Sequence, residues 1–257
     1  PEIFEEDMNM VPQALIVGFQ KAGTTALSRT LQKHPEMSVY KHEIHYFDNR
    51  RGKPPTNLSV YNYIHHLKKH ISKYNMTQPD RKRGLVLDKT PAYIKYPYRI
   101  RSVLPSSTKI IILLREPVDR IYSAFLHAAR TRAKKTGKFV DQKWNNMNCT
   151  ILNTCRSVVK LGQYMHFLDN WTSTFDNVFI GIYEHMWKPN YDWTKLQHFL
   201  ELRSPIVPIT HKVNFRTTKT PMPTYIQTNL TRFYQPYNRK LCSWLEEHRY
   251  TCPAWAK

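Results

Sequence analysis

The chain has 257 residues, 41% of them hydrophobic and 13% aromatic, which is enough for one sizeable core and excludes an intrinsically disordered chain. Lysine and arginine together number 39 against 19 acidic residues, so the net charge is +20. Such an excess favours a polyanionic partner of one of three classes: nucleic acid, an anionic polysaccharide or an anionic membrane surface. The densest basic runs lie at 65–73, 80–84 and 129–138.

The first third of the chain predicts a strand, a loop and a helix in succession. The apolar run ALIVG (14–18) ends in glycine, and TTALSRTLQKH (24–34) has the apolar spacing of a helix. A further helix is expected over 59–71, and the run GLVLD predicts a strand over 84–88.

The remainder of the chain repeats this alternation. The β-branched run KIIILLR (109–115) is typical of a buried parallel strand, and Pro117 suits the first turn of a helix over 117–132. Further elements are expected in the order loop or insertion 134–157, helix 161–175, strand 177–185 and, beyond a proline-punctuated stretch, helix 225–247. We therefore predict an α/β fold with a central parallel sheet, and a single domain over 1–257.

Cysteines and glycosylation motifs favour a secretory compartment. The cysteines form two local pairs, Cys149 with Cys155 and Cys242 with Cys252, and neither pair has the spacing of a zinc site. Either pair is suited to a disulfide in an oxidising compartment. N-x-[ST] sequons, of which about two are expected by chance, occur at Asn57, Asn75, Asn148, Asn170 and Asn229. No run of 18 apolar residues occurs and residues 1–13 do not resemble a signal peptide, so any membrane anchor is expected upstream.

The stretch GFQKAGTT (18–25) is close to a Walker A phosphate loop. Gly18 and Gly23 have the Walker spacing and threonines follow, but the lysine, Lys21, lies inside the loop. Backbone amides of such a loop and the start of its helix bind anions, and Lys21 adds a point charge. The alternative is that the two glycines serve only the turn.

A second anion site is expected where the strand 109–115 ends. Ligands of parallel sheets bind beyond the carboxyl ends of the strands, so the segments 18–25, 41–48, 88–93 and 113–123 should meet there. Arg115 at the end of a buried strand needs a partner, and Ser123 is close enough along the chain to contact the same phosphate. Together with the loop, this predicts a nucleotide that is charged at both ends.

Two alternatives remain open at this point. A magnesium-dependent P-loop kinase is suggested by LVLD, which ends at Asp88 as a Walker B strand would, although the Walker lysine is missing and Arg115 would repel a metal. A non-enzymatic heparin- or nucleic-acid-binding module would use the basic runs alone.

The motifs GFQKAGTTAL, KHEIHYFD, LDKTPAY and LLREPVDRIYS together resemble those of the heparan sulfate sulfotransferases, especially the glucosaminyl 3-O-sulfotransferases and more distantly the N-sulfotransferases. The resemblance covers roughly residues 12–125. It implies a donor, 3′-phosphoadenosine 5′-phosphosulfate, whose 3′-phosphate is bound by Arg115 and Ser123, with no metal required. The 5′-phosphosulfate would be bound by Lys21, Ala22, Gly23, Thr24 and Thr25.

The same resemblance assigns catalytic roles. Glu43 matches the general base, His45 its neighbouring histidine, Asp48 the acidic residue after the aromatic pair and Lys89 the second active-site lysine, beside Lys21. A sugar hydroxyl needs a carboxylate to take its proton, and sulfuryl transfer then needs alignment and cations. His45 and the KTPAY motif favour a hydroxyl acceptor over an amine. Strand-like alternation should point Glu43 and His45 to one side of the chain.

The resemblance fails near the C-terminus. Relatives have a K-G-F-[YW]-C loop, a disulfide hairpin and a later K-G-R, whereas this chain reads FRTTKTPMPTY. We expect Arg216, Thr218 and Lys219 to take over donor binding there. The whole pattern implies an anionic polysaccharide acceptor such as heparan sulfate, with the 3-hydroxyl of glucosamine as the favoured position, and no nucleic acid. It also implies the Golgi lumen, with a type II membrane anchor in the full-length protein.

Overall fold

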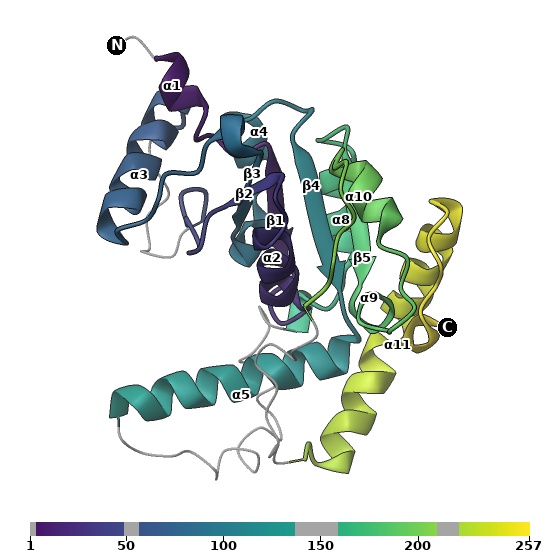
Figure 1. The fold of residues 1–257 in the computed structure, drawn as a ribbon. Helices are drawn as coiled ribbons and strands as arrows, with labels where there is room; N and C mark the ends of the chain where they lie inside the picture. Colours follow the sequence, from purple (N-terminus) through teal and green to yellow (C-terminus); the bar gives the residue numbers. More distant parts are fainter. Residues whose placement is uncertain (1–3, 49–56, 137–158, 210–220) are drawn as a thin grey trace.

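A parallel sheet of five strands in the order β2-β3-β1-β4-β5 forms the centre of the computed structural model (Figure 1). The structure describes residues 4–48, 57–136, 159–209 and 221–257. The strands are β1 Ala14–Gly18, β2 Met37–Val39, β3 Leu85–Lys89, β4 Lys109–Leu114 and β5 Val178–Ile182. All neighbouring strands pair in parallel, which confirms the predicted α/β fold with a central parallel sheet.

The middle strands are apolar throughout because helices cover both faces of the sheet. Every residue of β1 is buried, and so are all residues of β4 after Lys109. Ile16 pairs with Lys89 on one side and with Ile111 on the other. Strands buried on both faces read as continuous hydrophobic runs, and for this reason β1 and β4 were recognisable from the sequence.

Helices connect the strands and extend beyond the sheet. They are α1 Glu5–Met8, α2 Thr24–Gln32, α3 Val60–Lys73, α4 Pro97–Arg101, α5 Pro117–Thr136, α8 Met165–Thr172, α9 Tyr183–Met186, α10 Thr194–Phe199 and α11 Thr224–Glu247. The described residues also form three short 3₁₀ helices, η1 Arg81–Arg83, η2 Pro91–Lys95 and η4 Ala254–Ala256. Within the described residues, no helix is both long and apolar enough to cross a bilayer.

The differences from the sequence prediction include one strand that was not predicted and two elements with shifted ends. Strand β2 was not predicted, because a strand of three residues is too short to show a periodic pattern. The strand expected over 177–185 ends at Ile182, and the chain continues as α9. The helix expected over 161–175 begins only at Met165.

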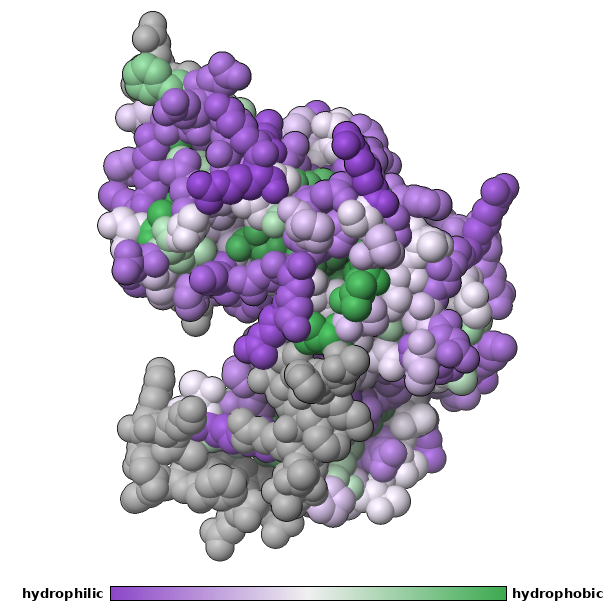
Figure 2. Space-filling model, in the orientation of Figure 1, coloured by the Kyte–Doolittle hydropathy of each residue, from purple (hydrophilic) through white to green (hydrophobic). Residues whose placement is uncertain are grey.

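The carboxyl ends of the strands face α5, which projects below the sheet in Figure 1. A separate hydrophobic cluster fastens the start of α5 to α11. Its members are Val118, Ile121, Val159, Ile226, Leu230 and Tyr234. Figure 2 shows, in the same orientation, hydrophilic side chains over most of the α3 side of the molecule.

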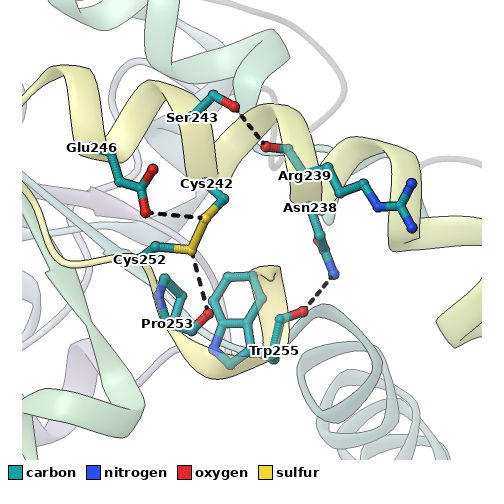
Figure 3. The surroundings of a disulfide bond; sticks show 8 residues. All are labelled: Asn238, Arg239, Cys242, Ser243, Glu246, Cys252, Pro253 and Trp255. Carbon is teal, nitrogen blue, oxygen red and sulfur yellow. Dashed lines mark hydrogen bonds between the residues drawn. A yellow bond between two sulfur atoms is a disulfide. The ribbon is translucent and has the colours of Figure 1, made fainter.

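One of the two cysteine pairs and four of the five sequons lie within the described residues. Cys242 and Cys252 form a disulfide at the end of α11 (Figure 3), whereas Cys149 and Cys155 lie outside the described residues. The sequon asparagines that the structure describes are all exposed: Asn57, Asn75, Asn170 and Asn229. Asn148 lies outside the described residues.

Candidate active site

Each of the four motifs follows a strand and reaches the carboxyl edge of the sheet. The phosphate loop follows β1, the segment 41–48 follows β2, Thr90 follows β3 and Arg115 follows β4. Because the strands are parallel, these four chain segments meet at one edge. The sequence prediction that they share a site is consistent with this arrangement.

The phosphate loop is a tight turn whose glycines are required sterically. Gly23 has φ of 90°, and a Cβ there would lie 2.7 Å from the ring of Tyr183. A Cβ on Gly18 would lie 2.8 Å from Cβ of Ile94. Lys21 also has a left-handed φ of 72°, and the Phe19 amide donates to the carbonyl of Leu113 at 2.9 Å, which fixes the loop to β4.

The start of α2 is suited to an anion. The helix begins at Thr24, Gly23 precedes it without a side-chain cap, and no acidic residue lies in the first turn. The first amides of a helix have no intrahelical acceptor and carry a partial positive charge. An anion at this loop would therefore complete the helix cap.

A chain of charged contacts joins four of the five residues predicted to be catalytic, all except Lys21. Lys89 Nζ lies 2.8 Å from Glu43 Oε1, and His45 Nε2 lies 3.0 Å from Glu43 Oε2. The other ring nitrogen of His45, Nδ1, lies 2.7 Å from Asp48 Oδ2. One carboxylate thus lies between a lysine and an imidazole, and a second carboxylate fixes the orientation of that imidazole.

The electrostatic surroundings of Glu43 keep its carboxylate ionised. Partial burial would raise its pKa, but the contacts with His45 and Lys89 outweigh burial and lower the pKa of Glu43 to about 2. The side chain is still 35% exposed, so it remains accessible to a ligand. An ionised, accessible carboxylate at a sheet edge is able to accept a proton.

The segment around Glu43 and His45 is not strand-like, which corrects the expectation of regular alternation. His45 has a left-handed φ of 56°, and residues 41–48 form bends and irregular chain. The two side chains meet because the backbone turns at His45. This turn also brings Asp48 to the far side of the imidazole ring.

The LDKTPAY motif fixes the backbone of that segment, a role that the sequence did not reveal. Thr90 Oγ1 accepts from the amide of Ile44 at 3.0 Å, and the hydroxyl of Tyr93 accepts from the amide of Tyr46 at 2.9 Å. From other elements, His66 of α3 contacts the carbonyl of Ile44 at 3.0 Å, and Arg99 donates to the carbonyl of Phe47 at 2.9 Å. Thr90 and Tyr93 belong to a recognised motif, whereas nothing in the sequence pointed to His66 or Arg99.

Asp88 is enclosed beneath this segment. It is fully buried, and its Oδ1 accepts from the hydroxyl of Thr90 at 2.8 Å. Burial raises the pKa of Asp88 to about 7. A Walker B aspartate must face its nucleotide, so the kinase alternative loses the residue on which it depended.

Arg115 lies against the phosphate loop. Its Nη1 donates to the carbonyl of Lys21 at 3.2 Å, and Nη2 contacts Asp119 Oδ2 at 3.1 Å. Its guanidinium lies 4.8 Å from the ring centroid of Tyr183. Its Nε is buried and has no hydrogen-bond partner among the described residues. Ser123 is partly exposed in the second turn of α5.

The family model of the sulfotransferase domain matches residues 11–240. The chain belongs to the sulfotransferase family. Heparan sulfate glucosamine 3-O-sulfotransferase 3A1 of Mus musculus is 26% identical over 208 residues, which are 78% of this chain and 48% of that protein. Heparan sulfate glucosamine 3-O-sulfotransferase 6 of Mus musculus is 32% identical over 172 residues, or 64% of this chain and 44% of the relative. The chain therefore spans about half the length of the curated relatives it matches, or less.

Among solved structures, a sulfotransferase from Alicyclobacillus acidocaldarius resembles this sulfotransferase domain with a TM-score of 0.70 at 21% identity. The alignment covers 96% of this chain and 99% of that one, and it shows a shared fold. The resemblance inferred from the four motifs is thus confirmed as a distant family relationship. The extent of the domain over all of 1–257 stays a prediction.

Part of the predicted donor site of this sulfotransferase domain lies outside the described residues. Arg216, Thr218 and Lys219 belong to the segment 210–220, so their assignment to donor binding stays a prediction. The catalytic and phosphate-binding roles given to the other residues are likewise carried forward as proposals.

Proposed function

We propose that this domain is a carbohydrate O-sulfotransferase that moves a sulfuryl group from 3′-phosphoadenosine 5′-phosphosulfate to a hydroxyl of an anionic glycan. The observation that carries the proposal is the Glu43 carboxylate, held between Lys89 and His45 at the same sheet edge as the Lys21 loop. A base and a group of cations at one edge suit the transfer of an anionic group to a hydroxyl.

The donor site fits the two charged ends of this nucleotide. The loop from Lys21 to Thr25 and the uncapped start of α2 suit the 5′-phosphosulfate. Arg115, with a buried Nε that has no partner among the described residues, suits the 3′-phosphate, and Ser123 would add a hydroxyl donor. The contact of Arg115 with the Lys21 carbonyl couples the two phosphate sites directly.

In the proposed reaction, Glu43 takes the proton of the acceptor hydroxyl while the hydroxyl oxygen forms a bond to the sulfur of the donor. The bond between sulfur and the bridging oxygen of the donor breaks, and the electron pair leaves with adenosine 3′,5′-bisphosphate. Lys21 and Lys89 stabilise the charge on the transferred and leaving oxygens. When Lys89 turns toward those oxygens, Glu43 loses a neighbouring cation, so its pKa rises and it becomes a stronger base.

The acceptor surface is proposed on α3 and the segment that precedes Glu43. Exposed cationic side chains on this surface are Lys41, Lys68, Lys69 and Lys73. His42 stacks on Tyr74 with ring centroids 4.3 Å apart, which places an aromatic surface next to these charges. Cations beside an aromatic surface suit an acidic sugar chain. The heparan sulfate named in the relatives makes glucosamine 3-OH our favoured acceptor, and the Golgi lumen with an upstream anchor our favoured location.

The direct test is sulfate transfer from labelled donor to a panel of polysaccharides, followed by mapping of the product. Heparan sulfate with free glucosamine 3-hydroxyls should be labelled, and Glu43→Gln should lower turnover by about 10²- to 10⁴-fold. Glu247→Gln, at the exposed end of α11, is the matched control and should be active. Label on glucosamine nitrogen would instead indicate an N-sulfotransferase. Label nowhere in the panel, with polysaccharide still bound, would leave only a binding module.

The donor half of the proposal is tested separately by calorimetry. Adenosine 3′,5′-bisphosphate should bind about 10- to 150-fold more tightly than adenosine 5′-phosphate, because Arg115 makes a charge-assisted contact with the additional phosphate. Arg115→Ala should remove most of that preference. Equal affinities of the wild-type protein for the two nucleotides would contradict the assignment of Arg115.

A further inference from the structure

The C-terminal turn is fastened to α11 by a covalent bond and a hydrogen bond (Figure 3). The disulfide between Cys242 and Cys252 joins the helix to the turn that follows it. Asn238 Nδ2 donates to the carbonyl of Trp255 at 3.2 Å. The hydroxyl of Tyr250 accepts from the amide of Ile180, which ties the same turn to β5. The position of the Trp255 indole is therefore set from several sides.

The indole of Trp255 contacts a carboxylate that reaches the donor site. Trp255 Nε1 donates to Glu184 Oε2 at 2.9 Å, and Glu184 Oε1 accepts from the backbone amide of Glu116 at 2.9 Å. Glu116 immediately follows Arg115. One carboxylate thus connects the C-terminal turn with the backbone next to the arginine proposed to bind the 3′-phosphate.

Glu184 is also adjacent in the chain to Tyr183, which contacts Arg115. The ring of Tyr183 lies under the Arg115 guanidinium and close to Gly23 of the phosphate loop. Burial raises the pKa of the Glu116 carboxyl. Hydrogen bonds from the amides of Asp119 and Val118 oppose this increase, and the charges of Asp119 and Glu184 add to it. Glu184 and Glu116 repel one another, and a donor on the outer side of Glu184 opposes its displacement. Trp255 supplies that donor.

We propose that Trp255 is a positioning residue of the donor site, which acts through Glu184 to hold Arg115 and Tyr183 in the geometry that distinguishes a 3′-phosphate. The disulfide keeps the indole where it can do so. This inference rests on the proposed function, because it assumes that Arg115 binds the 3′-phosphate. It adds a residue 140 positions away in the sequence to the determinants of donor specificity, counted from Arg115 to Trp255.

The experiment measures one ratio, the dissociation constant of adenosine 5′-phosphate divided by that of adenosine 3′,5′-bisphosphate. Trp255→Phe keeps an aromatic ring but removes the N–H donor. It should lower this ratio by about 3- to 10-fold, less than the roughly 10- to 150-fold of a directly lost hydrogen bond to a charged group, because Trp255 acts through Glu184. The KM for donor should rise by a similar factor while kcat stays the same, because Lys21 and Glu43 are untouched. Trp244→Phe is the matched control, since Trp244 lies on the adjoining helix α11 and stacks on His248.

A double-mutant cycle separates positioning from a general loss of packing. Glu184→Gln should lower the ratio by a similar factor, and Trp255→Phe combined with Glu184→Gln should be no worse than the stronger single variant, because both remove one contact. A ratio that Trp255→Phe leaves at the wild-type value would overturn the inference, and so would fully additive effects. If the wild-type protein binds the two nucleotides equally well, the assignment of Arg115 to the 3′-phosphate is wrong. That outcome contradicts the proposed function and is distinct from a failure of the inference on Trp255.

Discussion

Two carboxyl groups near the sheet edge, those of Glu43 and Asp88, are held with very different proton affinities. Burial outweighs all other influences at Asp88 and raises its pKa to about 7. At Glu43 the contacts with His45 and Lys89 outweigh burial and lower the pKa to about 2. The two residues have adjacent positions in the structure, since Thr90 bonds to Asp88 and to the amide of Ile44. The charged groups in contact with each carboxyl, and not its burial alone, therefore decide whether it is ionised and available as a base.

Asp88→Asn should flatten the dependence of stability on pH. A carboxyl whose folded pKa is raised from 3.8 to about 7 contributes stability that is fully present below the unfolded pKa and is lost as pH rises through the folded pKa. Asparagine keeps an oxygen acceptor for Thr90 and does not titrate. In urea unfolding between pH 4 and pH 8, the free energy of unfolding of the variant should therefore increase relative to that of the wild type as pH rises. The exposed Asp169→Asn is the control, and parallel curves for Asp88→Asn and the wild type would contradict the prediction.

Lys89→Met should shift the acid limb of the pH dependence of kcat/KM. Removal of the cation 2.8 Å from Glu43 leaves burial less opposed, so the pKa of Glu43 rises and the free enzyme loses its base at a higher pH. The wild type, with Glu43 near 2, should show no acid limb from this residue above pH 4. Lys95→Met, at an exposed position, should leave the profile unchanged. Profiles of identical shape for Lys89→Met and the wild type would place the base elsewhere.

At the scale of elements, helices α3 and α11 support the segments that carry the motifs. On one face of α3, His66 contacts the carbonyl of Ile44 in the segment 41–48. Lys69 and Lys73 of the same helix are exposed to solvent. Helix α11 packs on α5 through the second hydrophobic cluster and holds the C-terminal turn through its disulfide. Neither helix contributes a residue of the four recognised motifs, yet both contact elements that do.

Loss of the disulfide should destabilise the domain by about 3 kcal/mol, the value expected when a bond that closes a short loop no longer restricts the unfolded chain. Cys242 and Cys252 are 10 residues apart in the sequence. With Cys149 and Cys155 replaced by serine in every protein, Cys242→Ser should lower the midpoint of urea unfolding, and a reductant should lower the midpoint of the parent to the same value. The reductant should have no further effect on the Cys242→Ser variant. A midpoint of the parent that is insensitive to complete reduction would contradict this prediction.

For the whole molecule, the distribution of its charge matters more than the total of +20. The run at 80–84 forms η1 at the start of β3, which is the amino edge of the sheet and therefore opposite the candidate site. The run at 65–73 lies on α3, next to the segment 41–48 that contains Glu43. The run at 129–138 lies partly outside the described residues. Of the two basic runs that the structure describes in full, the one on α3 is placed to contact an acceptor.

Acceptor binding should weaken with added salt. It should also weaken when charges on α3 are reversed, but not when charges at the amino edge of the sheet are reversed. The KM for a polyanionic acceptor should rise steeply between low and physiological salt through screening and counterion release, and the KM for donor should change less. Lys69→Glu combined with Lys73→Glu should raise the acceptor KM and make it less sensitive to salt. Lys82→Glu with Arg83→Glu, the same charge change at the amino edge, should not. Equal effects of the two pairs would indicate that only net charge matters.

The sequence by itself determined the sheet centre and the identity of the candidate chemical groups. Strands β1 and β4 were predictable because burial on both faces produces continuous apolar runs, and the phosphate loop because glycine is needed where φ is positive. Glu43 and Lys89 were found because each lies in a short motif. All of this information is local, since it is contained in neighbouring residues of the chain.

Tertiary structure alone decided how those groups are held. The turn at His45, the support of Ile44 by Thr90 and the contact of Trp255 with Glu184 left no periodic signal in the sequence. Such contacts join residues 46 or 71 positions apart, and a single sequence does not specify which distant donor meets which acceptor. That pairing is fixed only when the sheet order and helix packing bring the segments together, because a hydrogen bond depends on distance and direction in space rather than on separation along the chain.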